Sequence, residues 1–326
     1  MSFVPLGARK ASSLSAIEQS YGVGRSDRPT PCGWITGPGP IATLLEVPLV
    51  QARAEDPSAL EEITRRLRRD IVTSTTSAGS GHPSTSLSMV EIVTVLYFGG
   101  VLRYDTSAPR DPGRDRFILS KGHGAPGLYA VLAEAGYFSV DELNTLRKLG
   151  SPLEGHPNMN RVPGVEASTG SLGQGLSIGI GHAVAARVDG RDYRVYVMQG
   201  DGETEQGQVW EAVMYAGNHG LDNLTLIIDR NGYQQTGAVD DIQPLDPLED
   251  KLRAFLWEVR TIDGHSLSEV AGAFDWARSV SGSPQAIIAN TVKGKGVSLL
   301  EATPGKFHGK PLTEGQRDDA LEEVGA

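Results

Sequence analysis

The chain has 326 residues, of which 39% are apolar and 21% charged, as in ordinary globular enzymes. Its 30 Lys and Arg residues are outnumbered by 40 Asp and Glu residues, so the formal charge is −10 and we expect no nucleic-acid or anionic-membrane partner. The single cysteine, Cys32, excludes an internal disulfide framework and a metal site built from cysteines, and apolar stretches such as Val93 to Leu102 are too short to span a bilayer.

The N-terminal residues 1–52 differ from the rest of the chain. They show no sustained hydrophobic period, and Pro and Gly cluster between Pro29 and Pro40. We expect an arm that is either mobile and loosely docked or ordered against a partner subunit. No apolar run follows a basic start, so no signal peptide is predicted and a cytoplasmic protein is expected. Residues 53–326 are predicted to form one domain.

The first predicted helix begins near Pro57. Ser58 and Glu61 form a capping-box pattern at its start. Apolar residues then recur at helical spacing on one face: Leu60, Ile63, Leu67 and Ile71. The glycines at 79 and 81 predict the end of this helix.

Further along, short apolar strands alternate with helical segments. The predicted strands are 194–199, 224–229, 257–262 and 286–291, and residues 208–219 are predicted to be helical. Strands separated by helices indicate an α/β fold with a mostly parallel sheet and helices on both faces. The acidic tail from Asp318 is predicted to be a solvated helix end.

The most informative motif follows the strand at 194–199. Gly200, Asp201 and Gly202 come directly after it, and Asn231 follows the next strand. Both strand ends lie at the carboxyl edge of a parallel sheet, where ligands bind in such folds. Gly202 lets a diphosphate approach the backbone, and the Asp and Asn oxygens suit Mg²⁺ or Ca²⁺ completed by diphosphate oxygens.

This motif, with the blocks around it, resembles the transketolase branch of the thiamin-diphosphate enzymes. The other matching blocks are 80–84 (SGHPS), 120–124 (SKGHG), 154–157 (EGHP), 168–175 (STGSLGQG), 263–265 (DGH), 293–296 (KGKG) and 307–310 (FHGK). They run in family order from about residue 59 to 315. The chain is similar to the amino-terminal half of a transketolase, which implies a thiamin-diphosphate-binding fold and the amino-terminal subunit of a split enzyme.

The resemblance implies a cofactor, thiamin diphosphate, and a divalent ion, Mg²⁺ or Ca²⁺. The implied metal ligands are Asp201, Asn231 and the main-chain carbonyl of Tyr233. The implied cofactor-binding residues are His123, Gly170, Ser171, Leu172, Gly200, Asp201, Gly202, Gln206, Asn231 and His308.

Four of the seven histidines stand in glycine-flanked loops, and the resemblance makes them catalytic: His82, His123, His156 and His308. It places them in the funnel where sugar hydroxyls meet the cofactor. Imidazoles suit that task because they exchange protons near neutral pH. His182 and His219 are predicted to be structural, while His265 is left open between a structural and a functional role.

Two lysine motifs have two interpretations each. Lys121, beside His123, either contacts a phosphate or is a solvated lysine. The 293–296 run looks like a phosphate grip, although the resemblance favours a structural exit from a strand near the site.

Two positions depart from the family pattern. The family has Glu where this chain has Gln206, and that Glu belongs to an acidic network linking the two cofactor sites of the dimer. Either the communication between sites differs here or Gln keeps the hydrogen bonds. Ser171 stands where Pro is usual.

The resemblance also predicts a partner. The glutamate that activates the cofactor's aminopyrimidine belongs to the pyrimidine-binding domain, which we expect on a separate carboxy-terminal subunit in an α₂β₂ assembly. The expected reaction transfers a two-carbon ketol unit between sugars or sugar phosphates. Alternatives are a specialised enzyme passing a glycolyl-type unit to an unusual acceptor, the alpha subunit of a 2-oxo acid dehydrogenase, or a non-catalytic scaffold.

Overall fold

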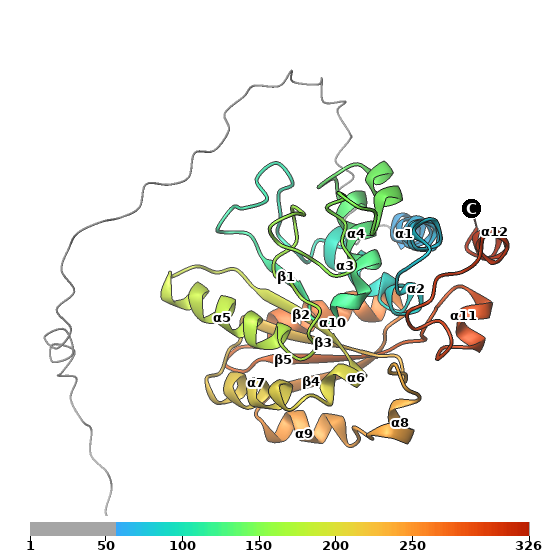
Figure 1. Ribbon diagram of the computed structural model, residues 1–326. Helices are drawn as coiled ribbons and strands as arrows, with labels where there is room; N and C mark the ends of the chain where they lie inside the picture. The colour runs from blue at the N-terminus through green and yellow to red at the C-terminus, as the bar shows by residue number, and fades with distance from the viewer. Residues whose placement is uncertain (1–56, 326) are drawn as a thin grey trace, which may run out of the picture. The chain divides into compact units, whose positions relative to one another are not determined.

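The computed structural model describes residues 57–325. The arm predicted for residues 1–52 lies outside the described residues. The core of the fold is one sheet of five strands, all parallel, in the order β1-β2-β3-β5-β4 (Figure 1). The strands are β1 (Arg116–Leu119), β2 (Val195–Gly200), β3 (Leu224–Arg230), β4 (Glu258–Asp263) and β5 (Gln285–Asn290).

Helices connect and cover these strands. They are α1 (Pro57–Ala78), α2 (Pro83–Leu87), α3 (Val90–Phe98), α4 (Ala125–Glu134), α5 (Gly175–Val188), α6 (Asp201–Thr204), α7 (Gly207–Asn218), α8 (Val239–Ile242), α9 (Leu248–Ala254), α10 (Leu267–Ser279), α11 (Ser298–Ala302) and α12 (Glu314–Glu323). Two short 3₁₀ helices, η1 (Gly122–Gly124) and η2 (Val140–Thr145), complete the described elements.

The predicted fold class is confirmed. The four predicted strands agree with β2, β3, β4 and β5 to within one residue at each end, and the helix predicted at 208–219 is α7, one residue earlier. Strand β1 was not predicted. It is only four residues long, and all four are buried.

The two faces of the sheet support two separate apolar cores because side chains alternate along each strand. On β2, Tyr196 and Met198 join the core under α1, α3, α4 and α10, while Val195 and Val197 join the core under α5, α7 and α9. Figure 1 shows α5, α7 and α9 together on one side of the sheet, with α1, α3 and α4 on the other.

Helix α1 follows the predicted apolar face. Leu60, Ile63, Leu67 and Ile71 are all buried. The helix ends at Ala78 as predicted, because Gly79 takes a positive φ of 59°. It begins at Pro57, as predicted, so Ser58 is the second residue of the helix.

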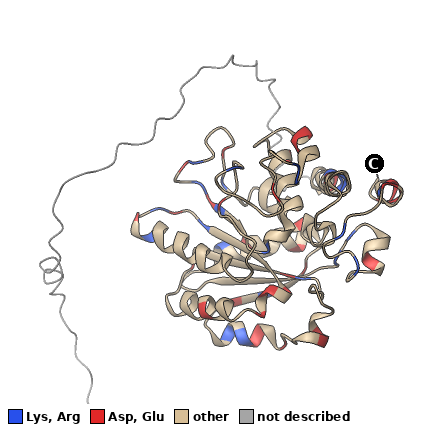
Figure 2. Ribbon diagram, in the orientation of Figure 1, with Lys and Arg blue, Asp and Glu red and all other residues tan. Residues whose placement is uncertain are grey.

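Charged residues of both signs are spread along the outer helices (Figure 2). Acidic residues stand out on α8 and α12, and Asp318 and Asp319, at the start of the predicted acidic helix end, are exposed on α12. Within residues 57–325, no helix is long and apolar enough to cross a membrane.

Candidate active site

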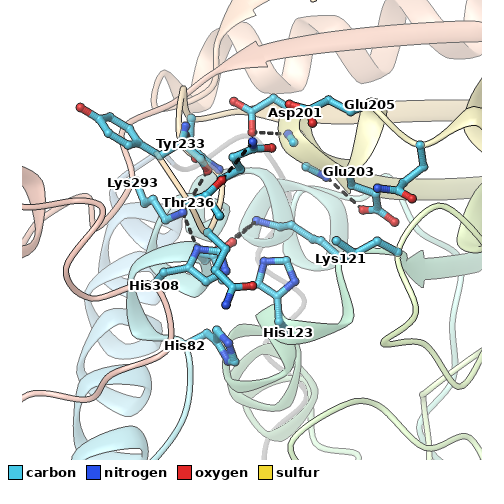
Figure 3. A pocket seen from close by; sticks show the side chains of 18 of the residues that line it. His82, Lys121, His123, Asp201, Glu203, Glu205, Tyr233, Thr236, Lys293 and His308 are labelled. Carbon is cyan, nitrogen blue, oxygen red and sulfur yellow. Dashed lines mark hydrogen bonds between the residues drawn. The ribbon is translucent and has the colours of Figure 1, made fainter. Parts of the chain in front are cut away.

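A cavity of about 380 Å³ opens at the carboxyl edge of the sheet, where the loops after β1, β2, β3 and β5 meet. Its lining contains every predicted site residue except Ser171, which is exposed beside Gln174. It also contains residues that the prediction did not assign to the site: Thr85, Lys121, Glu203, Glu205, Gln234, Gln235, Thr236 and Lys293. Segments more than 200 residues apart in the sequence therefore share one pocket (Figure 3).

Asp201 stands directly after β2 and is 2% exposed. Its carboxylate accepts hydrogen bonds from the backbone N–H of Gly202 at 2.8 Å and of Gly232 at 2.6 Å. Burial, and then the charge of Asp229, raise the pKa of Asp201 to about 6. The carboxylate is therefore held by two backbone donors, and the attraction of Lys293 offsets only part of the cost of its burial.

Asn231 and Tyr233 follow β3 and bring two more oxygens to the same edge. The side chain of Asn231 donates to Asp229 at 3.3 Å, and its amide oxygen accepts from the Tyr233 N–H at 3.2 Å. The Tyr233 carbonyl oxygen accepts from Nζ of Lys293 at 3.0 Å. Within residues 57–325, no three His, Cys, Asp or Glu side chains gather as a metal site. Any cation here therefore needs amide, carbonyl and ligand oxygens.

Lys293, in the loop after β5, points into this cavity (Figure 3). Its side chain is 2% exposed, and Nζ lies 2.8 Å from Nδ1 of His308. Burial lowers the pKa of Lys293 to about 8, against the attraction of Asp201. Of the two interpretations of the 293–296 run, this position favours the phosphate grip.

Lys121 is not a solvated lysine. Its ammonium is fully buried in an ion pair with Asp229, and it also donates to the Thr85 carbonyl oxygen at 2.9 Å. Ser88 donates to the same carboxylate at 2.6 Å. Lys121 lines the cavity, but because its ammonium is already paired with Asp229, the polar contacts of its side chain are within the protein.

Three of the predicted catalytic histidines form a compact cluster. The ring centroid of His123 lies 5.3 Å from those of both His82 and His308, and the His82 and His308 centroids are 5.5 Å apart. His156 is exposed at the rim and packs on Gly170, where an added Cβ would lie 3.0 Å from the imidazole Cγ. The four rings thus line one cavity, as predicted.

Burial keeps these rings neutral. It lowers the pKa of His82 to about 4 and that of His308 to about 3, and it lowers the pKa of His123 well below its usual range. Burial also lowers the pKa of His156. Nδ1 of His82 is buried, and no hydrogen-bond partner for it stands among the described residues 57–325. A neutral imidazole with a free ring nitrogen can accept a proton from a sugar hydroxyl and later return it.

The loop carrying Gly170 and Leu172 is anchored from below by Glu203, a residue that the sequence did not single out. The buried Glu203 carboxylate accepts from Ser120, from the Gly173 N–H at 2.8 Å and from the Gly200 N–H at 3.2 Å. It connects the loops after β1 and β2 to the 170–175 loop. Only its place one residue after Gly202 could have suggested this role.

Gln206 is the N-terminal cap residue of α7 and is exposed at the edge of the cavity. Its Cβ packs against Gly173, where an added Cβ would lie 2.9 Å away. The neighbouring Glu205 also lines the cavity, and burial raises the pKa of its carboxyl. A carboxylate is thus present one position before the family's Glu.

His265 and the two helical histidines lie away from the cavity lining. His265 contacts Glu91 and the backbone of Val292. His219 caps α7, and its ring stacks on Tyr215 at 3.9 Å. His182 lies on α5, as predicted.

A parallel α/β sheet with a buried acid, an amide and a lysine at its carboxyl edge, below a cluster of neutral histidines, agrees with the thiamin-diphosphate-binding fold that the sequence motifs resemble. Residues 58–326 match the family model described as "Transketolase, thiamine diphosphate binding domain". The chain belongs to the transketolase family.

Two relatives of similar length are named as subunits. The 6-deoxy-6-sulfo-D-fructose transketolase subunit of Clostridium sp. (strain MSTE9) is 45% identical over 76% of this chain and 89% of its own length. An apulose-4-phosphate transketolase subunit of Actinobacillus succinogenes is 42% identical over 81% of this chain and 95% of its own. The predicted amino-terminal subunit of a split transketolase, with its ketol-transfer chemistry, is confirmed at the level of the family.

Full-length transketolases match over less than half of their length. The rat enzyme is 43% identical over 82% of this chain and 42% of its own. The crystal structure of the Campylobacter jejuni transketolase superposes with a TM-score of 0.78 at 33% identity, over 83% of this chain and 43% of that one. These matches favour a transketolase over a 2-oxo acid dehydrogenase subunit.

Proposed function

We propose that this chain binds thiamin diphosphate together with a divalent cation and forms the active site with a separate carboxy-terminal subunit. The observation that carries the proposal is the convergence of Asp201, Asn231, Lys293 and the histidine cluster in one cavity. When bound, thiamin diphosphate supplies the carbanion chemistry that breaks and forms the carbon–carbon bond next to a carbonyl.

The donor set fits a hard cation. Asp201 offers a carboxylate, Asn231 an amide oxygen and Tyr233 a main-chain carbonyl, which with diphosphate oxygens suit Mg²⁺ or Ca²⁺. The raised pKa of Asp201 supports this assignment, because a buried carboxylate is stabilised when a cation lies beside it. Lys293 adds a positive charge for the diphosphate, a role for which a buried ammonium is well suited.

The histidines act on the sugar. We assign proton transfer at donor and acceptor hydroxyls to His82, His123, His156 and His308. In their neutral state His82, His123 and His156 can accept a proton. His308, whose Nδ1 accepts from Lys293, instead presents its Nε2–H as a donor. Gly170, Ser171 and Leu172 are proposed to contact the cofactor from the facing loop.

The partner completes the site. Relatives that this chain covers almost entirely are named as subunits, which supports a two-chain enzyme. We propose an α₂β₂ assembly in which Gln206 lies within about 10 Å of the partner, because it stands at the exposed edge of the cavity. The partner is proposed to supply the carboxylate that activates the aminopyrimidine.

The substrates are proposed to be ketoses that carry an anionic group. Both subunit relatives are named for such sugars, one a phosphate and one a sulfonate. We propose that residues of the partner choose between such substrates.

Titration of the full chain with thiamin diphosphate, with and without Mg²⁺, tests the cofactor assignment. Binding should appear or strengthen at least tenfold with the metal. A chain that binds no thiamin diphosphate at millimolar concentration in the presence of Mg²⁺ would overturn it.

A further inference from the structure

The loop after β5 carries two lysines, of which one side chain points into the cavity and the other lies outside it. Lys293 points into the cavity, whereas Nζ of Lys295 lies outside it, 3.9 Å from Glu301. Gly294 between them takes a φ of +84°, and an added Cβ there would lie 2.5 Å from Cβ of Leu300. The direction of Lys293 therefore depends on the path of the loop backbone.

Two side chains from distant elements hold that backbone. The Val292 N–H donates to Nε2 of His265 at 2.8 Å, immediately before Lys293. On the other side, Nε of Arg68 donates to the Lys295 carbonyl oxygen at 3.2 Å. The two hydrogen bonds therefore flank Lys293 on both sides.

Both side chains are joined through a single carboxylate, that of Glu91 on α3. Arg68 forms an ion pair with one oxygen, and Nδ1 of His265 lies 3.0 Å from the other. The three side chains are only 10–12% exposed. Removing one member of such a buried group leaves a polar partner without its hydrogen bond. The loss of any one of the three side chains should therefore destabilise the fold.

The contacts fix the tautomer of His265. Because the Val292 N–H can only donate, Nε2 must accept and carries no proton. Nδ1 then holds the proton of the neutral ring and donates it to Glu91. A proton on Nε2 would face the Val292 N–H directly. The neutral ring therefore joins Glu91 to the loop, and neither of its nitrogens is free for catalysis.

We infer that Glu91, Arg68 and His265 form a bracket that sets the backbone of the loop so that Lys293 reaches the diphosphate subsite, with His265 as a positioning residue. The inference rests on the proposed function, because it takes the diphosphate of thiamin diphosphate as the ligand of Lys293. It also gives His265 a role that the sequence left open.

Two substitutions of His265 test its hydrogen bonds to Val292 and to Glu91 separately. His265→Gln keeps an acceptor near the Nε2 position for Val292, while His265→Asn keeps a donor near the Nδ1 position for Glu91 but loses the link to the loop. For the full chain with Mg²⁺, calorimetry should show thiamin diphosphate binding weakened about tenfold by Asn and by less than about threefold by Gln. Exchange of the Val292 amide hydrogen should be faster in the Asn variant.

A double-mutant cycle tests whether the effect passes through Lys293. In a Lys293→Met background, His265→Asn should weaken binding by less than about twofold further, because the group that it positions is already gone. Full additivity of the two losses, or equal binding by the Asn and Gln variants, would overturn the bracket.

The outcomes distinguish the two proposals. If the unsubstituted chain binds no thiamin diphosphate, the proposed function fails, and with it the ligand assigned to Lys293. If the unsubstituted chain binds normally but Val292 exchange is the same in the Asn and Gln variants, the bracket alone is wrong.

Discussion

A hydrogen bond of 2.8 Å joins Nζ of Lys293 to Nδ1 of His308. Because an ammonium group only donates, Nδ1 of His308 accepts, and the neutral ring keeps its proton on Nε2. Burial and the nearby Lys293 charge lower the pKa of His308 to about 3, so the ring does not become charged at physiological pH. One contact thus links a cation proposed for the diphosphate to a histidine proposed for the sugar.

Replacing this cation should weaken cofactor binding selectively. Lys293→Met removes a buried charge, and loss of a charged hydrogen bond corresponds to about 10- to 100-fold in affinity. Lys295→Met is the matched control, because Lys295 points away from the cavity toward Glu301. Thiamin diphosphate titration of both variants is the measurement. Equal losses at the two positions would show that only the general charge of the loop matters.

The metal assignment has its own test in Asp201. Asp201→Asn keeps the size of the side chain but removes the charge that favours a divalent cation, so Mg²⁺ should no longer strengthen thiamin diphosphate binding. Glu205→Gln is the control, since it removes a carboxylate of the same cavity that is not among the proposed ligands. An Asp201 variant that retains metal-dependent binding would refute the ligand set.

Each cavity histidine should matter for turnover more than for stability. We expect Ala at His82, His123, His156 or His308 to lower kcat of the two-subunit enzyme by about 10²- to 10⁴-fold. His219→Ala, on the outer end of α7, should leave kcat unchanged. Rates with a ketose donor and urea unfolding provide the two readouts. Unchanged rates in all four cavity variants would remove the assignment.

Acid should destabilise the domain through these rings. The pKa values of about 4 for His82 and about 3 for His308 lie below the ordinary 6.5, so between those values the unfolded state binds more protons. The contribution of these two histidines to the free energy of unfolding is therefore at its maximum above pH 6.5, and it falls as the pH drops toward 4.

Between pH 7 and pH 5, the free energy of unfolding in urea should fall less for the double variant His82→Asn/His308→Asn than for the unsubstituted chain. The raised pKa values of Asp70 and Asp201 act in the opposite direction, but both groups remain in the two proteins, so the difference reports the histidines. Parallel pH profiles for the two proteins would contradict the assignment of neutral buried rings.

The sheet was largely predictable because its strands are apolar and separated by helices. Runs such as 224–229 are long enough to show, whereas β1 has four residues and no flanking pattern of its own. The predicted end of β2 falls one residue short because its last residue, Gly200, has no apolar side chain to mark it as part of the strand.

The site was predictable where it depends on local motifs and not where it depends on distant contacts. Glycine-flanked histidines and the Gly200–Gly202 turn are visible in the sequence. The ion pair of Lys121 with Asp229 joins residues 108 positions apart, and no local pattern indicates it. Likewise, Lys293 and Lys295 are equivalent in the sequence, and only the loop path decides which one faces the cavity.

The most direct test of the two-subunit account is reconstitution of ketol transfer. The rate should be measured for this chain alone, for a subunit carrying the pyrimidine-binding domain alone, and for their equimolar mixture, each with thiamin diphosphate, Mg²⁺ and a panel of anionic ketoses. We predict activity only in the mixture, which should sediment as a heterotetramer. Robust ketol transfer by the purified single chain would contradict the account.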